Sequence, residues 1–471
     1  MNPQLALLLC AVGVAGLFYL DRGDTKGVTR ALWLPTLWTA LVAARPVSYW
    51  LGVGPANPTP QQIMEGNPID AAVFGLLLVG ALIVVWRRRE QVKPILKLAW
   101  PILLYFAYCG LSTLWSAYTE ISLKRWFKSW GDLAMVLLIA TEPDIAAALR
   151  RLFSRVGFIL MPASVLVIKY FPAIGKGYDS WTGVSWDNGV SGNKNMLGVI
   201  TFVVLLGVVW HLMALLRDKG IPHRARHLLA QWVLLGFGIW VLVLSHSDTS
   251  AAAFALGSLF LLATALPALR KPAAVHVLVL LVLLGGSVTY WLGGEADVTH
   301  AMGRKSSLTG RTEIWAGVLQ VAAEHPILGV GFESFWTGTN LYRVWRHLPV
   351  GENVNESHDG YIEVLAQLGW VGVVLIALIL LTAYRRAVAA FRRYPALGGL
   401  LVSYVVSLVI YNITEAGFRM MDPSWIFLLF AFVASAKILS AQPEAATEHP
   451  ELLPVAVPAE LLAGERWRGA V

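Results

Sequence analysis

Charged residues are scarce in this chain of 471 residues. Asp, Glu, Lys and Arg make up 14% of it, whereas a soluble domain carries about 25%. The deficit coincides with repeated apolar runs close to the length that crosses a bilayer, about 20 residues. Since lipid offers the backbone no hydrogen-bond partner, such runs must be helical. The sequence therefore predicts an all-α polytopic membrane protein and excludes an ordinary soluble domain.

Cysteine is also nearly absent. The chain has two, Cys10 and Cys109, and both lie in apolar runs. No group of Cys and His has the spacing of a metal site, so the sequence predicts no disulfide, no metal centre and no cofactor. The formal net charge of +8 comes mostly from short loops, where basic residues set the orientation of spans. A nucleic-acid partner is therefore not expected.

Hydropathy predicts 12–13 transmembrane helices and one long helical loop outside the cytoplasm. An N-terminal bundle of about ten spans covers 1–293, the loop covers 294–368, three further spans cover 369–440, and a tail rich in Pro, Glu and Ala, 441–471, is expected to be disordered and cytoplasmic. The predicted spans are 3–20, 30–50, 68–86, 97–115, 124–141, 151–171, 196–216, 228–245, 249–269, 273–293, 369–385, 396–413 and 423–440.

Basic residues gather on alternate loops between these spans. The loops concerned are 21–30, 87–97, 150–155, 217–226, 270–271 and 385–393. Alternation puts them all on one side, which we expect to be the cytoplasm. The long loop then faces the opposite side.

Several cations break this rule because they lie on the outer side. Any one of them could reach the lipid headgroups by snorkelling. Together they predict an anion site, and the planar fork of arginine suits phosphate. The candidates are Lys124, Arg125 and Lys128 at the start of the fifth span, Lys194 before the seventh, and Arg304, Arg311, Arg343 and Arg346 in the long loop.

Within the long loop, Arg311 lies in the first turn of a predicted amphipathic helix that ends before Pro326. The helix dipole does not favour a cation there. This placement suggests a functional role, and a salt bridge to Glu313 or another acid is the alternative.

His358 stands at the start of the next predicted helix, which Ser357 or Asp359 can cap. The positive end of the helix dipole disfavours an imidazolium, so the sequence predicts a neutral His358 at pH 7. A neutral histidine can serve as a general base, a role worth about 10²–10⁴-fold in rate. The alternative is that His358 only hydrogen-bonds nearby backbone.

These motifs resemble the O-antigen ligase and polysaccharide polymerase superfamily. The residues that carry the resemblance are Gly310-Arg311, Trp315, Pro326, Gly329-Val330-Gly331, His358-Asp359-Gly360-Tyr361, Leu365, Leu368-Gly369 and Gly372. The stretches Leu114-Trp115-Ser116 with Lys124-Arg125, and Gly192-Asn193-Lys194-Asn195-Met196-Leu197-Gly198, resemble its exopolysaccharide-polymerase branch.

The resemblance implies a metal-independent, inverting glycosyltransferase of the bacterial inner membrane. It would move a glycan from an undecaprenyl-diphosphate carrier to a glycan or lipid acceptor at the periplasmic face, with other polysaccharide assembly proteins as candidate partners. Arg311 matches the family arginine that engages the diphosphate, and His358 the histidine proposed to activate the acceptor hydroxyl. Asp359 departs from the Asn or Ser-like residue usual after that histidine. The stretch 245–250 lacks the arginine of many members, so Lys194 or Arg343 is expected to replace it.

The sequence leaves alternatives open. A polymerase is slightly preferred over a ligase that acts on lipid A core or on protein. A transporter or flippase of the same lipid would need polar residues near mid-membrane, where Asp132 stands out, and often internal repeats, which are not seen. A non-catalytic scaffold of an export complex is disfavoured by the outer arginines.

Overall fold

The computed structural model describes residues 1–23, 27–54, 62, 66–178, 185–266, 271, 273–281, 309–348 and 354–440. Within these ranges, eight helices are long and apolar enough to cross a membrane. They are α1 (Pro3–Leu20), α5 (Pro68–Arg87), α9 (Ile145–Tyr170), α11 (Lys194–Arg217), α12 (Arg224–Leu244), α18 (Gly360–Arg393), α19 (Pro395–Thr414) and α20 (Pro423–Ser440). The predicted all-α polytopic membrane fold is confirmed.

The other predicted spans take different forms. The run 97–115 belongs to a pair bent by 85°, in which α6 (Arg89–Leu98) is followed by α7 (Trp100–Ser112) and η2 (Thr113–Trp115). The run 30–50 is divided into η1 (Arg30–Leu32), α2 (Trp33–Ala43) and α3 (Val47–Trp50), and 124–141 lies in α8 (Thr119–Ala140). The run 249–269 is the 17-residue α13 (Asp248–Thr264), and most of 273–293 and the tail 441–471 lie outside the described residues.

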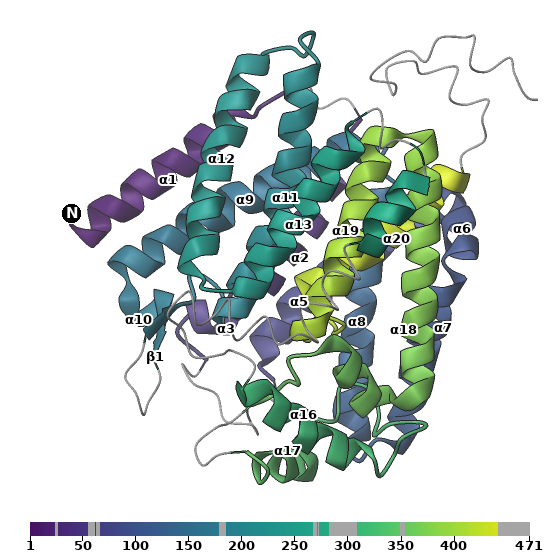
Figure 1. Cartoon of the computed structure of the whole chain (residues 1–471). Helices are drawn as coiled ribbons and strands as arrows, with labels where there is room; N and C mark the ends of the chain where they lie inside the picture. Colours follow the sequence, from purple (N-terminus) through teal and green to yellow (C-terminus); the bar gives the residue numbers. More distant parts are fainter. Residues whose placement is uncertain are drawn as a thin grey trace, which may run out of the picture.

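A short hairpin interrupts the helical pattern between α9 and α11. After α10 (Pro172–Gly175), β1 (Lys176–Tyr178) pairs antiparallel with β2 (Ser185–Asp187). Lys176 Nζ lies 3.2 Å from Asp187 Oδ1 across the pair. The hairpin lies at the same end of the bundle as the start of α11 (Figure 1).

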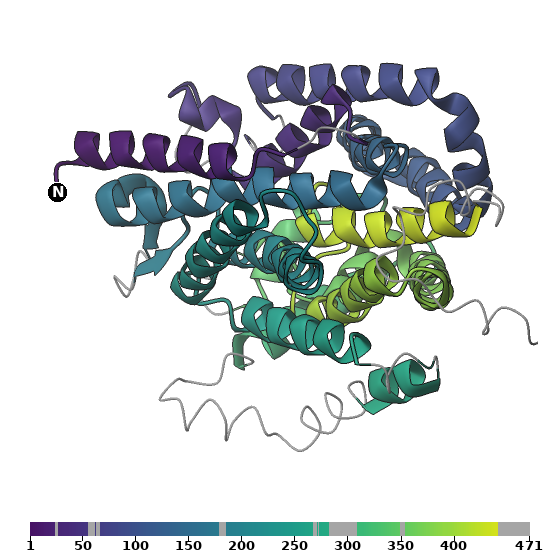
Figure 2. The same ribbon diagram turned by 90° about the horizontal axis from the view of Figure 1, so that it is seen from above.

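The helices divide into a buried centre and an apolar periphery. In α9, α11, α19 and α20, 78–83% of the most apolar stretch is buried inside the protein, against 11% in α1 and α5. Figure 2 shows α1 and α5 along the edge of the bundle. Their outward apolar side chains are therefore suited to contact lipid.

Three of the basic loops, 21–30, 87–97 and 385–393, lie at one end of the bundle, in agreement with the prediction of a common side. Arg88 Nη1 lies 2.8 Å from Glu142 Oε1, and Arg88 Nη2 donates to Thr29 Oγ1 at 2.8 Å. Arg386, near the end of α18, donates to the backbone carbonyl of Leu98. The helices α16 (Thr309–Ala322) and α17 (Gly338–Trp345) of the long loop lie at the other end (Figure 1). These two helices and the three basic loops are therefore at opposite ends of the bundle.

Two glycines let the segment after α16 cross the start of α18 at backbone contact. Gly369 has φ +63°, and a Cβ added there would lie 2.2 Å from the carbonyl oxygen of Ile327. Gly329 has φ +68°, and its added Cβ would lie 2.3 Å from the carbonyl oxygen of Gln367. Trp370 N donates to Pro326 O at 2.9 Å. This crossing anchors the loop to the bundle.

We therefore expect Gly369→Ala to lower stability by about 1–3 kcal/mol, the usual cost of a strained backbone conformation. Thermal unfolding in detergent measures it. Gly236→Ala is the matched control, because that glycine lies inside α12 with open space around its Cβ position, and alanine favours helix. Equal melting temperatures for the two variants would contradict the prediction.

Candidate functional site

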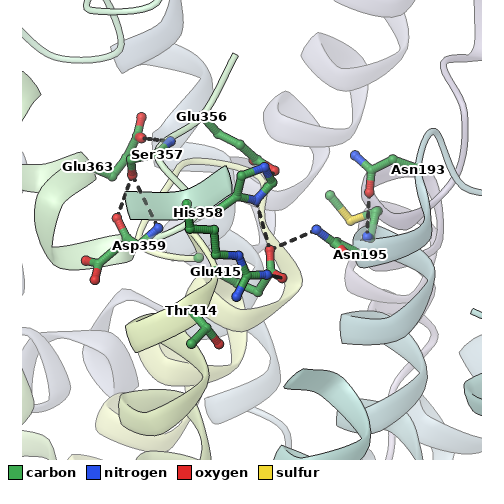
Figure 3. A network of polar contacts seen from close by, with 12 residues as sticks. Asn193, Asn195, Glu356, Ser357, His358, Asp359, Glu363, Thr414 and Glu415 are labelled. Atoms are coloured by element: carbon green, nitrogen blue, oxygen red, sulfur yellow. Dashed lines mark hydrogen bonds and ion pairs between the residues drawn. The ribbon is translucent and has the colours of Figure 1, made fainter. Parts of the chain in front are cut away.

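A cluster of charged and amide side chains lies at the end of the bundle that holds the long loop. Its centre is Glu415, which follows the last residue of α19 and has a side chain 5% exposed. Glu415 Oε1 accepts a hydrogen bond from Arg311 Nη2 at 2.9 Å, and Oε2 accepts one from Asn195 Nδ2 at 2.9 Å. His358 Nδ1 lies 3.4 Å from the same Oε2 (Figure 3). One buried carboxylate thus joins three segments that are distant in the sequence.

Arg311 lies in the first turn of α16, and its side chain is 18% exposed. Its ion-pair partner is Glu415 rather than the neighbouring Glu313. An opposite charge at this distance offsets the unfavourable position of a cation at a helix start. The guanidinium has five N–H donors, so the pair with Glu415 leaves donors for another anion.

His358 is held just before α18 in a left-handed backbone conformation, with φ 51°. Such a conformation costs about 1–3 kcal/mol in a non-glycine residue and is common at functional sites. Asp359 is the residue that caps α18, because its Oδ1 accepts from the backbone N–H of Tyr361 and of Ile362, both at 2.8 Å. This answers which of the two predicted candidates caps the helix, and it assigns Asp359 a structural role.

Two carboxylates face the Nδ1 atom of His358. Glu356 Oε1 lies 3.3 Å from it and Glu415 Oε2 3.4 Å. Burial by itself lowers the pKa of His358, but the hydrogen bond to Glu415 and the charges of both carboxylates outweigh it and raise the pKa above its ordinary value. The direction is opposite to the one expected from the helix dipole, since the nearby carboxylates favour the imidazolium. With Nδ1 facing both acids, Nε2 is the atom left to exchange a proton with a substrate.

A second ion pair extends the cluster. Arg419 Nη1, in the connection between α19 and α20, lies 2.9 Å from Glu356 Oε2. Burial works against the charge of Arg419, yet the surrounding carboxylates, Glu333 and Glu363 foremost, raise its pKa. Glu356 is therefore shared between Arg419 and His358, as Glu415 is shared between Arg311 and His358.

Comparison with known proteins identifies the region that holds Arg311 and His358. Residues 233–377 match the O-antigen ligase family. The chain is also 27% identical over 296 residues to the exopolysaccharide production protein ExoQ of Rhizobium meliloti (strain 1021), an alignment that covers 60% of this chain and 64% of that protein. Both findings confirm the predicted resemblance to the O-antigen ligase and polymerase superfamily.

The matched segment 233–377 contains Arg311, Glu356 and His358, whereas Glu415 and Asn195 lie outside it. Sequence reasoning selected Arg311 and His358 but assigned no role to Glu415, and it did not select Glu356 or Asn195. A faint signal existed for Glu415, an acidic residue directly after an apolar span. The sequence did not show which side chains contact the carboxylate of Glu415.

Lys194 is the predicted cation that lies nearest in sequence to this cluster. It is the first residue of α11, is exposed, and directly precedes Asn195. The turn 245–250 lies close by, because Thr249 Oγ1 is 2.9 Å from Thr414 Oγ1. Ser247 also packs against Gly198 of α11, where an added Cβ would lie 2.6 Å from Ser247 Cβ. The start of α11 and this turn therefore border Glu415.

The other predicted cations have different surroundings. Arg343 pairs with Glu324, just beyond the C-terminal end of α16, which is about 20 Å along the helix from Arg311. The structure thus does not bring Arg343 to Arg311, so the expectation that it replaces the missing arginine loses its support. Arg346 is exposed directly after α17, and Arg304 lies outside the described residues.

The three cations of α8 each make a different contact. Lys124 pairs with Glu120 on an exposed face. Arg125 donates to the backbone carbonyl of Glu333, beside the long loop. Lys128 Nζ lies over the ring of Phe74 at 4.8 Å from its centroid. Of the three, Arg125 is therefore the one that contacts the matched segment 233–377.

The side chains of Glu356, His358 and Glu415 are close enough together to bind a metal ion, since one ligand atom from each lies within 4.8 Å of the others. However, Arg419 already neutralises Glu356 and Arg311 already neutralises Glu415. A divalent ion bound there would lie beside two guanidinium groups, whose positive charges oppose its binding. The charge balance favours a network of ion pairs.

Proposed function

We propose that this protein is a membrane glycosyltransferase of the O-antigen ligase and polymerase superfamily. In this proposal it takes a glycan from an undecaprenyl-diphosphate carrier and transfers it, or polymerises it, at the periplasmic face of the bacterial inner membrane. The observation that carries the proposal is the meeting of Arg311 and His358 at Glu415, at the end of the bundle opposite the basic loops. A diphosphate group and an attacking hydroxyl need these two kinds of side chain close together.

Arg311 would act on the donor. As the bond between the sugar and the diphosphate breaks, the electron pair stays with the diphosphate, and its negative charge grows. A fixed guanidinium stabilises that charge more in the transition state than in the ground state. The pair with Glu415 holds the guanidinium in place, and the other N–H groups of the guanidinium would donate to the phosphate oxygens.

His358 would act on the acceptor. The acceptor hydroxyl oxygen attacks the anomeric carbon from the side opposite the diphosphate, and its proton moves to His358 Nε2. The new glycosidic bond forms as the old carbon–oxygen bond breaks, so the configuration at the anomeric carbon is inverted. A pKa raised by two carboxylates makes the neutral imidazole a stronger base, so the neutral form takes the hydroxyl proton more readily.

The relative's name, which refers to exopolysaccharide production, supports a polymerase over a ligase that uses lipid A core or protein. The transporter alternative gains no support from Asp132. That carboxylate is buried and accepts from Trp38 Nε1 at 2.9 Å and from the backbone N–H of Met421 at 2.8 Å. Its hydrogen bonds give it a structural role.

We expect the purified protein in detergent to convert an undecaprenyl-diphosphate-linked oligosaccharide into longer or transferred glycan when EDTA is present. The reason is that Arg311 and His358 supply the charge and the base. Chromatography of the glycan products measures the conversion. A requirement for Mg²⁺ or Mn²⁺ would contradict the metal-independent part of the proposal. Movement of the lipid across proteoliposomes without any new glycan would favour a flippase.

A further inference from the structure

We infer that Glu415 is a positioning residue that fixes Arg311 and His358 relative to each other. The inference rests on the proposed function, because it assigns Glu415 a part in the same reaction. Among the described contacts, Glu415 is the residue that Arg311 and His358 share. Glu415 Oε1 accepts a hydrogen bond from Arg311, and Oε2 accepts one from Asn195 and faces His358 Nδ1.

The backbone around Glu415 is held firmly. Its N–H donates to Tyr411 O at 3.1 Å, and its own carbonyl accepts from Gly417 N at 3.1 Å. Gly417 N also donates to Asn412 Oδ1 at 2.9 Å, and Asn412 is buried near the end of α19. A side chain that leaves so rigid a turn can set the positions of groups borne by less constrained segments.

Asn195 connects the carboxylate to α11, one of the most buried helices of the bundle. An amide donor holds Glu415 Oε2 without adding a charge that would compete with His358 for it. Asn193, two residues before Asn195, caps α11 by accepting from Met196 N at 2.7 Å, as Figure 3 shows. The amide of Asn195 therefore extends from a well-defined helix start.

The chemical consequence concerns which nitrogen of His358 carries the proton. A carboxylate against Nδ1 favours the form in which Nδ1 bears hydrogen, so that Nε2 keeps its lone pair for the acceptor hydroxyl. Glu356 also faces Nδ1 but is more exposed and is bound by Arg419. Glu415 is the buried partner, and it is the one whose other oxygen holds the guanidinium assigned to the diphosphate.

The test uses Glu415→Gln in the full chain, assayed with the same lipid-linked donor across a range of pH. The amide keeps the shape of the side chain and removes its charge. We expect transfer at neutral pH to fall about 10²-fold, the effect of misplacing reacting groups by about 1 Å. We also expect the pH midpoint of the rate to move to lower pH, since an amide no longer stabilises the imidazolium, and the KM for the donor to rise.

Glu142→Gln is the matched control. Glu142 is another buried carboxylate bound by arginine and threonine, Arg88 and Thr29, but at the opposite end of the bundle. Its replacement should lower the melting temperature while the pH midpoint and the donor KM stay as in the wild type. A purely structural role for Glu415 would give the same pattern in Glu415→Gln, and that result would overturn the inference.

Asn195→Ala is the second variant, for use if Glu415→Gln does not fold. It removes one support of the carboxylate and leaves no buried charge unpaired, so the expected loss of transfer is smaller than for Glu415→Gln. Wild-type rates in Asn195→Ala and a wild-type pH midpoint in Glu415→Gln would each count against the inference. A wild-type protein that transfers no glycan would instead overturn the proposed function itself, and the role of Glu415 with it.

Discussion

Replacement of Arg311 by alanine is expected to abolish detectable glycan transfer, with a loss of at least about 10²–10³-fold. That is the range found when one group that stabilises a developing oxyanion is removed. Arg311 is held at 2.9 Å by Glu415, the buried carboxylate that also faces the histidine assigned to the acceptor. Product formation by the purified variant from the lipid-linked donor measures the effect, and the KM for the donor should rise as well.

The Arg311→Ala variant also leaves the carboxylate of Glu415 buried without its cation. Breaking a buried ion pair in this way costs about 3–5 kcal/mol of stability, so loss of activity alone would be ambiguous. Combining Arg311→Ala with Glu415→Gln removes the unpaired charge. This double variant should recover thermal stability and still transfer no glycan. Near-normal transfer by the double variant would remove Arg311 from the mechanism.

Arg311→Lys separates charge from geometry. Lysine keeps the positive charge but cannot bind a carboxylate and a phosphate with a planar fork. Its activity should therefore lie between the wild type and Arg311→Ala. An activity equal to the wild type would mean that only a point charge is needed at this position.

The fold class and the two ends of the bundle could be predicted because both depend on properties visible along the chain. Apolar length predicts spans, and basic loops on alternate connections predict one common side; the contacts of Arg88 and Arg386 agree with this. Hydropathy does not reveal a change of direction inside an apolar run. The bend of 85° between Leu98 and Trp100 was therefore missed, although Pro101 at the start of α7 was visible.

The site was predicted only in part because its contacts join distant segments. Arg311 and Glu415 are 104 positions apart in sequence, and Asn195 and Glu415 are 220 apart. Hydropathy placed each of them at the same end of the bundle but could not say which of them touch. Arg311 and His358 were selected because each follows a local pattern, a helix start, that can be read from neighbouring residues.

The pKa of His358 shows the limit of local reasoning, because it is shifted in the direction opposite to the one expected from the helix start. The helix dipole acts within one turn and is visible in the sequence. Glu356 is close in sequence, but nothing there indicated that its carboxylate turns toward Nδ1 at 3.3 Å. Glu415 approaches from another helix altogether. Two full negative charges at this distance outweigh the partial charge of a helix end.

His358→Ala is expected to lower transfer by about 10²–10⁴-fold, the contribution of a general base. The pH dependence distinguishes this role from a structural one. Because Glu415 and Glu356 raise the pKa of His358, the wild-type base is protonated and inactive below that pKa, and the rate should rise with pH until His358 is neutral. His358→Gln keeps a side chain that can hydrogen-bond Glu415 but cannot take up the proton. It should therefore lose the rising limb together with the rate.

His347→Ala is the matched control for this prediction, since His347 is an exposed histidine of the same loop, beyond the end of α17. Its pH profile should match the wild type. A rising limb that persists in His358→Gln at the wild-type midpoint would mean that another group accepts the proton. Arg311 would still pair with Glu415 in that variant. Such a result would leave the role of Arg311 at the donor diphosphate intact. The acceptor hydroxyl would then need a base other than His358.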